Sequence, residues 1–240
     1  MGLITTKAIV LSSLKYSESS LIVKCYNEEL GLISFIERGV LKSKKRGNKM
    51  AHFQPLNQLI IVFNYKNKNV LSTIKELSIL HPYQNIPSDI IKQTMVLFLS
   101  EILSKAIQGE TEDKQLFQYL VTALDWLDVH DHVANFHLLF LLNLTKFLGF
   151  YPDLTHAHYP GFDMLEGRFT ENLMDKHVIS KNEFYQFKKL LGINFDKVDT
   201  VTFSKQERQL VLQTLIHYFK LHLGNFSDPK SLPILETVFN

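Results

Sequence analysis

Residues 20–49 read SLIVKCYNEELGLISFIERGVLKSKKRGNK, and their pattern sets the architecture of the N-terminal part of the chain. Residues 20–26 alternate between two faces, which is the period of a β-strand. The turn-forming residues 27–31 follow, and residues 32–40 make a second apolar run. The pattern therefore predicts a β-hairpin that leads into a basic loop.

Three further strand-like runs accompany this hairpin, at residues 3–13, 56–65 and 70–80. Five short runs with turn signals between them predict a small all-β barrel or sandwich. A five-stranded barrel of this size is the OB-fold pattern. We therefore predict an OB-fold domain over residues 1–80.

The hydrophobic period becomes helical after the segment 81–87, which holds two prolines. Residues 133–149 are apolar on nearly every side but too short and too polar for a membrane span, so they predict a buried core helix. Ser180 and Ser204 each precede a Glu by three residues, which predicts two capped helix starts.

These patterns predict an α+β multidomain protein in which an all-α helical domain, residues 81–240, follows the OB-fold barrel. Residues 151–179 show no period and are interpreted as an irregular insert.

The charge of the chain is unevenly distributed. Residues 1–80 hold 12 Lys and Arg against 5 Asp and Glu, a net charge of +7, whereas residues 81–240 carry −5. A basic domain of this kind indicates an anionic partner. The single cysteine, Cys25, excludes an internal disulfide and favours a cytoplasmic location.

The basic loop is the strongest functional signal, although a merely solvated loop is the alternative interpretation. Basic side chains beside a β-surface guide a nucleic-acid backbone, while aromatic side chains stack on bases. Five loop cations on five single-strand phosphates would give a log–log salt slope of about −3.5. The candidate nucleic-acid contacts are Lys24, Arg38, Lys42, Lys44, Lys45, Arg46 and Lys49.

No catalytic constellation stands out in the sequence. Cys25 lies on a strand face and is interpreted as a core residue, and the tripeptide 130–132 (His-Asp-His) as a loop. His156, His158 and His177 lack cysteines that could complete a zinc site. A metal-dependent hydrolase in the helical domain, and an OB-fold RNA-binding protein, stay open as alternatives.

The chain resembles the RecO family of bacterial recombination mediators over nearly its whole length. Each motif is weak by itself, but their order and spacing together are specific. They are YSE at 16–18, YNEELG at 26–31, RG at 38–39, QPL at 54–56, NFH at 135–137, LGFYP at 148–152 and SLPIL at 231–235.

The resemblance implies a non-enzymatic protein that binds single- and double-stranded DNA and anneals complementary strands without ATP. It also implies two partners, RecR and the C-terminal tail of single-stranded DNA-binding protein (SSB), and an indirect role in loading RecA onto SSB-coated DNA. A cytoplasmic, nucleoid-associated protein without a membrane span is expected.

The sequence departs from the family in one region. Many members carry four zinc-binding cysteines after the central helix, and residues 153–169 contain none. We expect no metal cofactor there, and packing by Phe162, Leu165 and Phe169 in its place. The acidic, apolar-ended SSB tail needs a cation at its receptor, and Lys146 and Arg168 are the candidates for protein docking.

Overall fold

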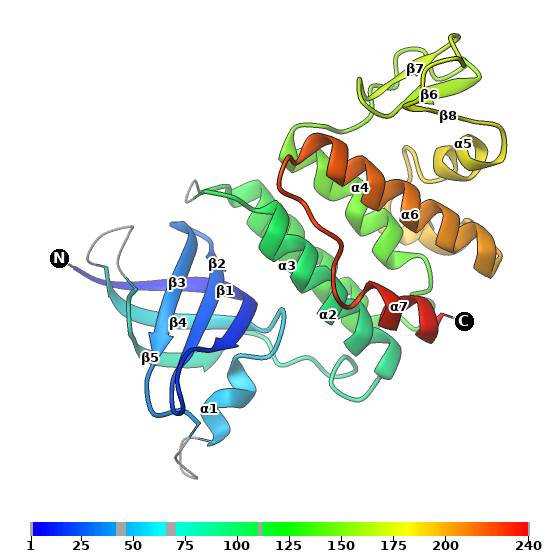
Figure 1. Cartoon of the computed structure of the whole chain (residues 1–240). Helices are drawn as coiled ribbons and strands as arrows, with labels where there is room; N and C mark the ends of the chain where they lie inside the picture. Colours follow the sequence, from blue (N-terminus) through cyan, green and yellow to red (C-terminus); the bar gives the residue numbers. More distant parts are fainter. Residues whose placement is uncertain (1, 42–46, 66–70, 110–111, 240) are drawn as a thin grey trace. The chain divides into compact units, whose positions relative to one another are not determined.

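The computed structural model describes residues 2–41, 47–65, 71–109 and 112–239 (Figure 1). One compact unit comprises Met1–Val129 with Pro229–Ser231, and a second comprises His130–Asp228 with Leu232–Asn240. The first holds β1 (Gly2–Lys15), β2 (Leu21–Asn27), β3 (Gly31–Glu37), α1 (Gly47–His52), β4 (Gln58–Tyr65), β5 (Ile74–Ile79), α2 (Ile90–Ala106) and α3 (Lys114–Val129). The second holds α4 (Phe136–Leu148), β6 (Gly161–Asp163), β7 (Arg168–Thr170), β8 (Val178–Ser180), α5 (Lys181–Lys188), the 3-10 helix η2 (Phe195–Thr200), α6 (Lys205–His222) and α7 (Leu232–Val238).

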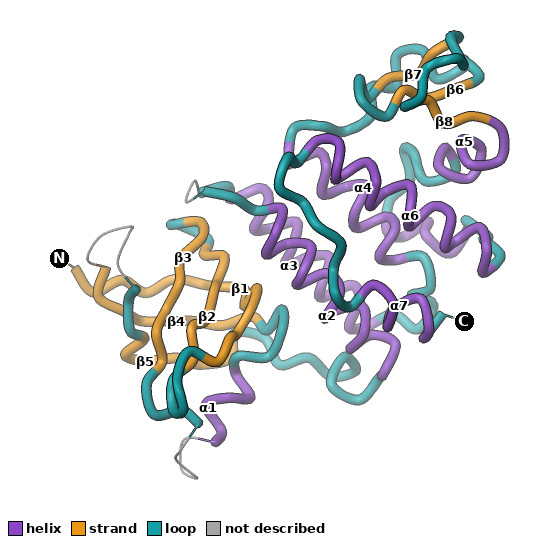
Figure 2. Tube along the Cα trace, viewed as in Figure 1, coloured by secondary structure: helices purple, strands orange, loops and turns teal. Residues whose placement is uncertain are grey.

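The strands β1 to β5 form one antiparallel sheet in the order β3-β2-β1-β4-β5 (Figure 2). The sheet closes where Phe35 of β3 forms a parallel bridge with Ser72, which lies just before β5. There the Ile36 N–H donates to the Ser72 carbonyl at 2.8 Å. A five-stranded barrel closed in this order is the Greek-key arrangement of the OB-fold, so the predicted fold is confirmed.

Alternate residues of each strand fill the interior of the barrel. The rings of Phe35 and Phe63 meet edge to face there, with centroids 5.0 Å apart. Cys25 belongs to the same buried cluster, and burial raises the pKa of its thiol well above the ordinary range. Cys25 is thus a core residue, as its position in an alternating strand predicted.

Two local predictions in the barrel were wrong. The end of the predicted basic loop forms α1, whose last carbonyls at Ala51 and His52 accept the Asn57 side-chain amide at 2.9 and 3.1 Å. The fourth strand begins at Gln58 rather than at Leu56, because Leu56 adopts a left-handed φ of 58°. The predicted domain boundary at 80/81 lies between β5, which ends at Ile79, and α2, which begins at Ile90, but the first compact unit continues to Val129.

The helix α4 is the most deeply buried helix element of the second unit, with every residue from Phe136 to Thr145 buried. Gly149 ends it with a left-handed φ of 83°. Ser204 caps α6 through the predicted capping box. Ser180 is the N-cap of α5, so the predicted helix start is confirmed, but its side chain makes no cap bond and the predicted capping box was wrong. Glu183 instead accepts the Thr214 hydroxyl at 2.8 Å.

The segment interpreted as an irregular insert contains a three-stranded antiparallel sheet in the order β7-β6-β8. Its strands are three residues each, too short to show a period. Phe162 of β6 packs against Phe169, Phe187 and Tyr218, with ring centroids 5.4, 5.2 and 5.9 Å away. Leu165 is 46% exposed and takes no part, so the predicted packing holds for the two phenylalanines only.

Among the described helices, none combines the length and the apolar character that crossing a bilayer requires.

Candidate nucleic-acid interface

The outer face of strands β1 to β3 divides into a covered end and a bare end. At the covered end Tyr26 is 1% exposed, and its hydroxyl donates to the Asp113 carbonyl at 3.3 Å. Its ring packs on Phe117 of α3 at 6.3 Å. Burial, together with the Asp113 charge, raises the pKa of Tyr26 to about 12. Tyr26 therefore joins the barrel to the helices of the same unit, and its buried ring is not accessible for stacking on bases.

Lys24 lies beside this covered end. Its ammonium donates to the Ser104 carbonyl, near the end of α2, at 2.6 Å. Partial burial lowers the pKa of Lys24 from its ordinary value. This predicted contact residue is therefore already engaged within the fold.

Arg38 follows β3 directly and is exposed. The preceding residue, Glu37, points inward, is 2% exposed and accepts the Ile74 N–H at 2.9 Å. β3 ends at Glu37, and Arg38 lies in the turn that follows. Of the predicted basic contacts that the structure describes, Arg38 is the one whose side chain is exposed to solvent.

Lys49 forms an ion pair with the buried carboxylate of Glu37. Taking a charge out of water is costly unless a partner compensates it, so Lys49 has a structural task in the barrel. The remaining predicted contacts, Lys42, Lys44, Lys45 and Arg46, lie outside the described residues.

The two predicted docking residues of the second unit do not share a site. The Lys146 ammonium lies 4.6 Å from the centroid of the Tyr151 ring, and partial burial lowers the pKa of Lys146. Arg168 is exposed on β7, 3.8 Å from the Glu166 carboxylate. Neither lines the pocket described next, which the sequence did not reveal.

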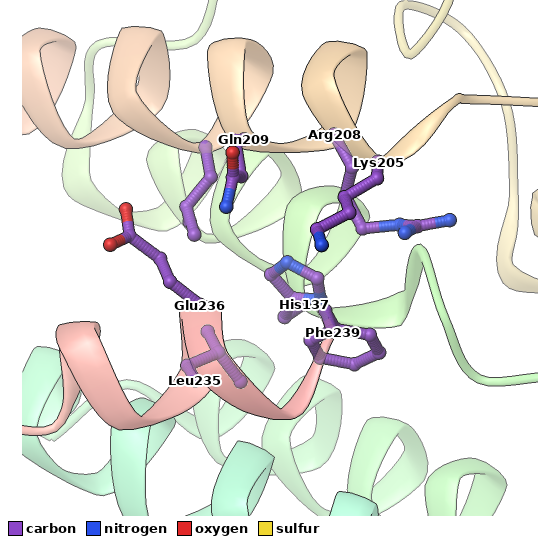
Figure 3. Close-up of a pocket in the computed structure, with 8 residues that line it drawn as sticks. His137, Lys205, Arg208, Gln209, Leu235, Glu236 and Phe239 are labelled. Atoms are coloured by element: carbon purple, nitrogen blue, oxygen red, sulfur yellow. The ribbon is translucent and has the colours of Figure 1, made fainter.

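The pocket lies between α6, α7 and the start of α4 in the second unit (Figure 3). It is small and partly open to solvent. Its lining combines two cations, a carboxylate and an amide with apolar and aromatic groups: His137, Lys205, Arg208, Gln209, Leu212, Leu235, Glu236 and Phe239.

Arg208 is held in place at one wall of this pocket. Its Nε donates to the Asn135 side-chain oxygen at 3.0 Å, and its guanidinium lies 5.6 Å from the Phe239 ring centroid. The Phe239 ring stacks on His137 with centroids 5.2 Å apart (Figure 3). Burial and the nearby Arg208 charge lower the pKa of His137 to about 3, so the ring is neutral at physiological pH.

The histidines of the insert form no metal site in the structure. The His156 ring stacks on Tyr159 at 5.0 Å and lies 6.0 Å from His158. In the part of the chain that the structure describes, no group of three or more His, Cys, Asp or Glu is arranged to hold a metal ion. A four-cysteine zinc module does not fit this chain, because Cys25 is its one cysteine and lies in the barrel core.

Fold and surface together define an OB-fold protein with an appended helical region, and comparisons with known proteins agree. The family model "Recombination protein O N terminal" matches residues 1–83, and "Recombination protein O C terminal" matches residues 87–233.

Relatives named "DNA repair protein RecO" match over almost the full length. The one from Flavobacterium psychrophilum is 47% identical over 240 residues, covering 99% of both chains. Those from Bacteroides fragilis (strain YCH46) and Porphyromonas gingivalis are 37% and 31% identical, covering 98% or more of each chain. The chain belongs to the RecO family.

Proposed function

We propose that this chain is a DNA repair protein that acts as a non-enzymatic recombination mediator. It binds single- and double-stranded DNA through its OB-fold barrel and anneals complementary strands. Membership of the RecO family over the full chain carries this proposal. The exposed Arg38 beside the basic segment 42–46, on a domain of net charge +7, supports it.

The proposal places the protein at SSB-coated DNA in the cytoplasm, associated with the nucleoid while bound. RecR and the SSB tail are its proposed direct partners, and RecA loading is the proposed outcome. No metal cofactor is required, in keeping with the absence of cysteines from residues 153–169.

Strand annealing tests the proposal. Complementary labelled oligonucleotides should anneal faster with the purified protein, in EDTA and without nucleotide. Loss of annealing in EDTA would favour the metal-dependent alternative. If unlabelled single-stranded RNA competes for the protein better than DNA of the same sequence, the RNA-binding alternative is favoured instead.

The second unit is proposed to dock the SSB tail. The pocket combines the cations Lys205 and Arg208 with the apolar Leu212 and Leu235, which suits an acidic peptide with an apolar end, and one carboxylate, Glu236, opposes such a peptide. Lys146 and Arg168 are the other candidate docking residues. Comparing the peptide affinity of charge-reversal variants at the three sites distinguishes between them.

A further inference from the structure

The hairpin between β1 and β2 exposes large apolar side chains. Leu14 is 65% exposed and Tyr16 is 63% exposed, although both belong to or adjoin a well-paired strand. Burying apolar side chains of this size is favourable, so leaving them in water forgoes that free energy of burial. Their exposure on a folded strand marks a surface for a partner.

Strand register places these residues in one continuous row with neighbours from β2 and β3. Leu14 pairs with Ile22, and Ile22 pairs with Ile36, which puts three apolar side chains across adjacent strands. Tyr16 extends the pairing, because its N–H donates to the Ser20 carbonyl at 2.9 Å. Alternation along the strand turns Tyr16 to the same face as Leu14. Leu14, Tyr16, Ile22 and Ile36 are called the hairpin strip below.

The other end of the same sheet face is covered by the protein itself. Ile9 and its cross-strand partner Tyr26 are 0% and 1% exposed. Intramolecular packing therefore stops short of the hairpin strip, and the described residues of the first unit leave Leu14 and Tyr16 accessible.

One exposed basic residue adjoins the hairpin strip: Arg38 follows two residues after Ile36. Lys15 pairs with Leu21 of the interior cluster, so it lies on the opposite face of the hairpin. Glu18, in the same loop, is the acidic group nearest in sequence to Tyr16. An aromatic and apolar row with an arginine at its end, on a domain of net charge +7, matches unstacked bases joined by phosphates.

We propose that the hairpin strip is the surface on which bases of single-stranded DNA stack, with Tyr16 as the stacking platform. This inference rests on the proposed DNA binding and assigns to Tyr16 a contact that single strands make and duplexes do not. A duplex keeps its bases stacked on one another and presents only phosphates to Arg38. Tyr16 therefore contributes to single-strand affinity and leaves duplex affinity unchanged.

The test compares Tyr16→Ala, Tyr16→Phe and Tyr185→Ala in the full chain. Tyr185 is the matched control, because it is 61% exposed on α5. Binding to labelled oligo-dT and to a duplex of equal length is measured by fluorescence anisotropy across a salt series. Thermal unfolding followed by circular dichroism checks that each variant is folded.

Tyr16→Ala is expected to weaken oligo-dT binding about 5- to 150-fold, the range that corresponds to the loss of one base stack. The salt slope stays the same, because no phosphate contact is lost. Tyr16→Phe and Tyr185→Ala bind like the wild type.

Unchanged oligo-dT affinity of a folded Tyr16→Ala variant would overturn the proposal and assign the hairpin strip to a protein partner. Equal losses for oligo-dT and duplex would also overturn it. If the wild-type protein bound neither oligo-dT nor the duplex, the proposed function would be overturned, together with the proposed role of the hairpin strip.

Discussion

The Lys92 ammonium donates a hydrogen bond of 2.8 Å to the main-chain carbonyl of Asp128, and both residues are 1% exposed. The Asp128 carboxylate accepts three successive main-chain N–H groups, those of Gln84, Asn85 and Ile86, at 2.8–2.9 Å. Burial alone would raise the pKa of Asp128, but these bonds and the Lys92 charge lower it on balance. The segment that leaves the barrel is therefore fixed to α3 by one buried carboxylate.

Asp128→Ala should destabilise the first unit by about 3 kcal/mol or more, because it leaves a buried ammonium and three N–H groups without the carboxylate. Trp126, the single tryptophan, lies two residues away in α3, so its fluorescence reports the unfolding of this unit. Urea unfolding followed by its fluorescence measures the loss. The control Asp131→Ala removes an exposed carboxylate and should change stability by less than about 0.5 kcal/mol. Equal stability of the two variants would contradict the anchoring role.

The buried His137 should make the second unit sensitive to acid. Its pKa is near 6.5 when unfolded and about 3 when folded, so the unfolded chain binds the extra proton as the pH falls between these values. Stability is therefore highest above about pH 6.5 and declines below it by up to ~1.4 kcal/mol per pH unit.

Thermal unfolding followed at 222 nm across this pH range checks the expectation. His137→Gln should flatten the profile, whereas His217→Gln, at an exposed position of α6, should leave it as in the wild type. A wild-type profile for His137→Gln would show that another group causes the acid sensitivity.

Phe162→Ala should cost about 3–5 kcal/mol, because it opens a cavity among Phe169, Phe187 and Tyr218. Leu165→Ala, in the same segment at 46% exposure, should cost less than about 0.5 kcal/mol. Chemical denaturation of both variants, followed by circular dichroism, gives the two values. Similar costs would mean that the aromatic cluster does not hold the small sheet in place.

Charge reversal distinguishes the three proposed sites for the SSB tail. Lys205→Glu, at an exposed position of the pocket lining, should weaken binding of an acidic tail peptide by ~0.2–1 kcal/mol or more, because it replaces an attraction by a repulsion. Lys146→Glu and Arg168→Glu should then bind the peptide like the wild type, as measured by anisotropy. A loss confined to either of these two variants would move the docking site away from the pocket.

Strand alternation was enough to predict the barrel, because the period of residues 20–26 survives intact in β2, with Val23 and Cys25 inside and Lys24 outside. It could not predict α1, because strand alternation carries no signal for a six-residue helix whose end is capped by the Asn57 side chain. The small sheet was missed because three-residue strands carry no measurable period.

The candidate site was less predictable than the fold, because counting charges does not reveal their partners. Lys24 donates to a carbonyl 80 residues further on, and Lys49 is paired with the buried Glu37. The pocket brings together His137, Arg208 and Phe239, which lie on separate helices or at their ends, and no local motif links them.

The proposal that the barrel binds DNA through its basic segment is tested most directly by the salt dependence of oligo-dT binding. Lys49 is left unchanged in the variant, because it neutralises the buried Glu37. Arg38 is counted among the phosphate contacts, because its side chain is exposed. With Arg38, Lys42, Lys44, Lys45 and Arg46 on five phosphates, the wild-type log–log slope should be about −3.5. Changing Lys42, Lys44, Lys45 and Arg46 to Ala should reduce it to about −0.7. A flat wild-type dependence, or a variant with the wild-type slope, would contradict the proposed interface.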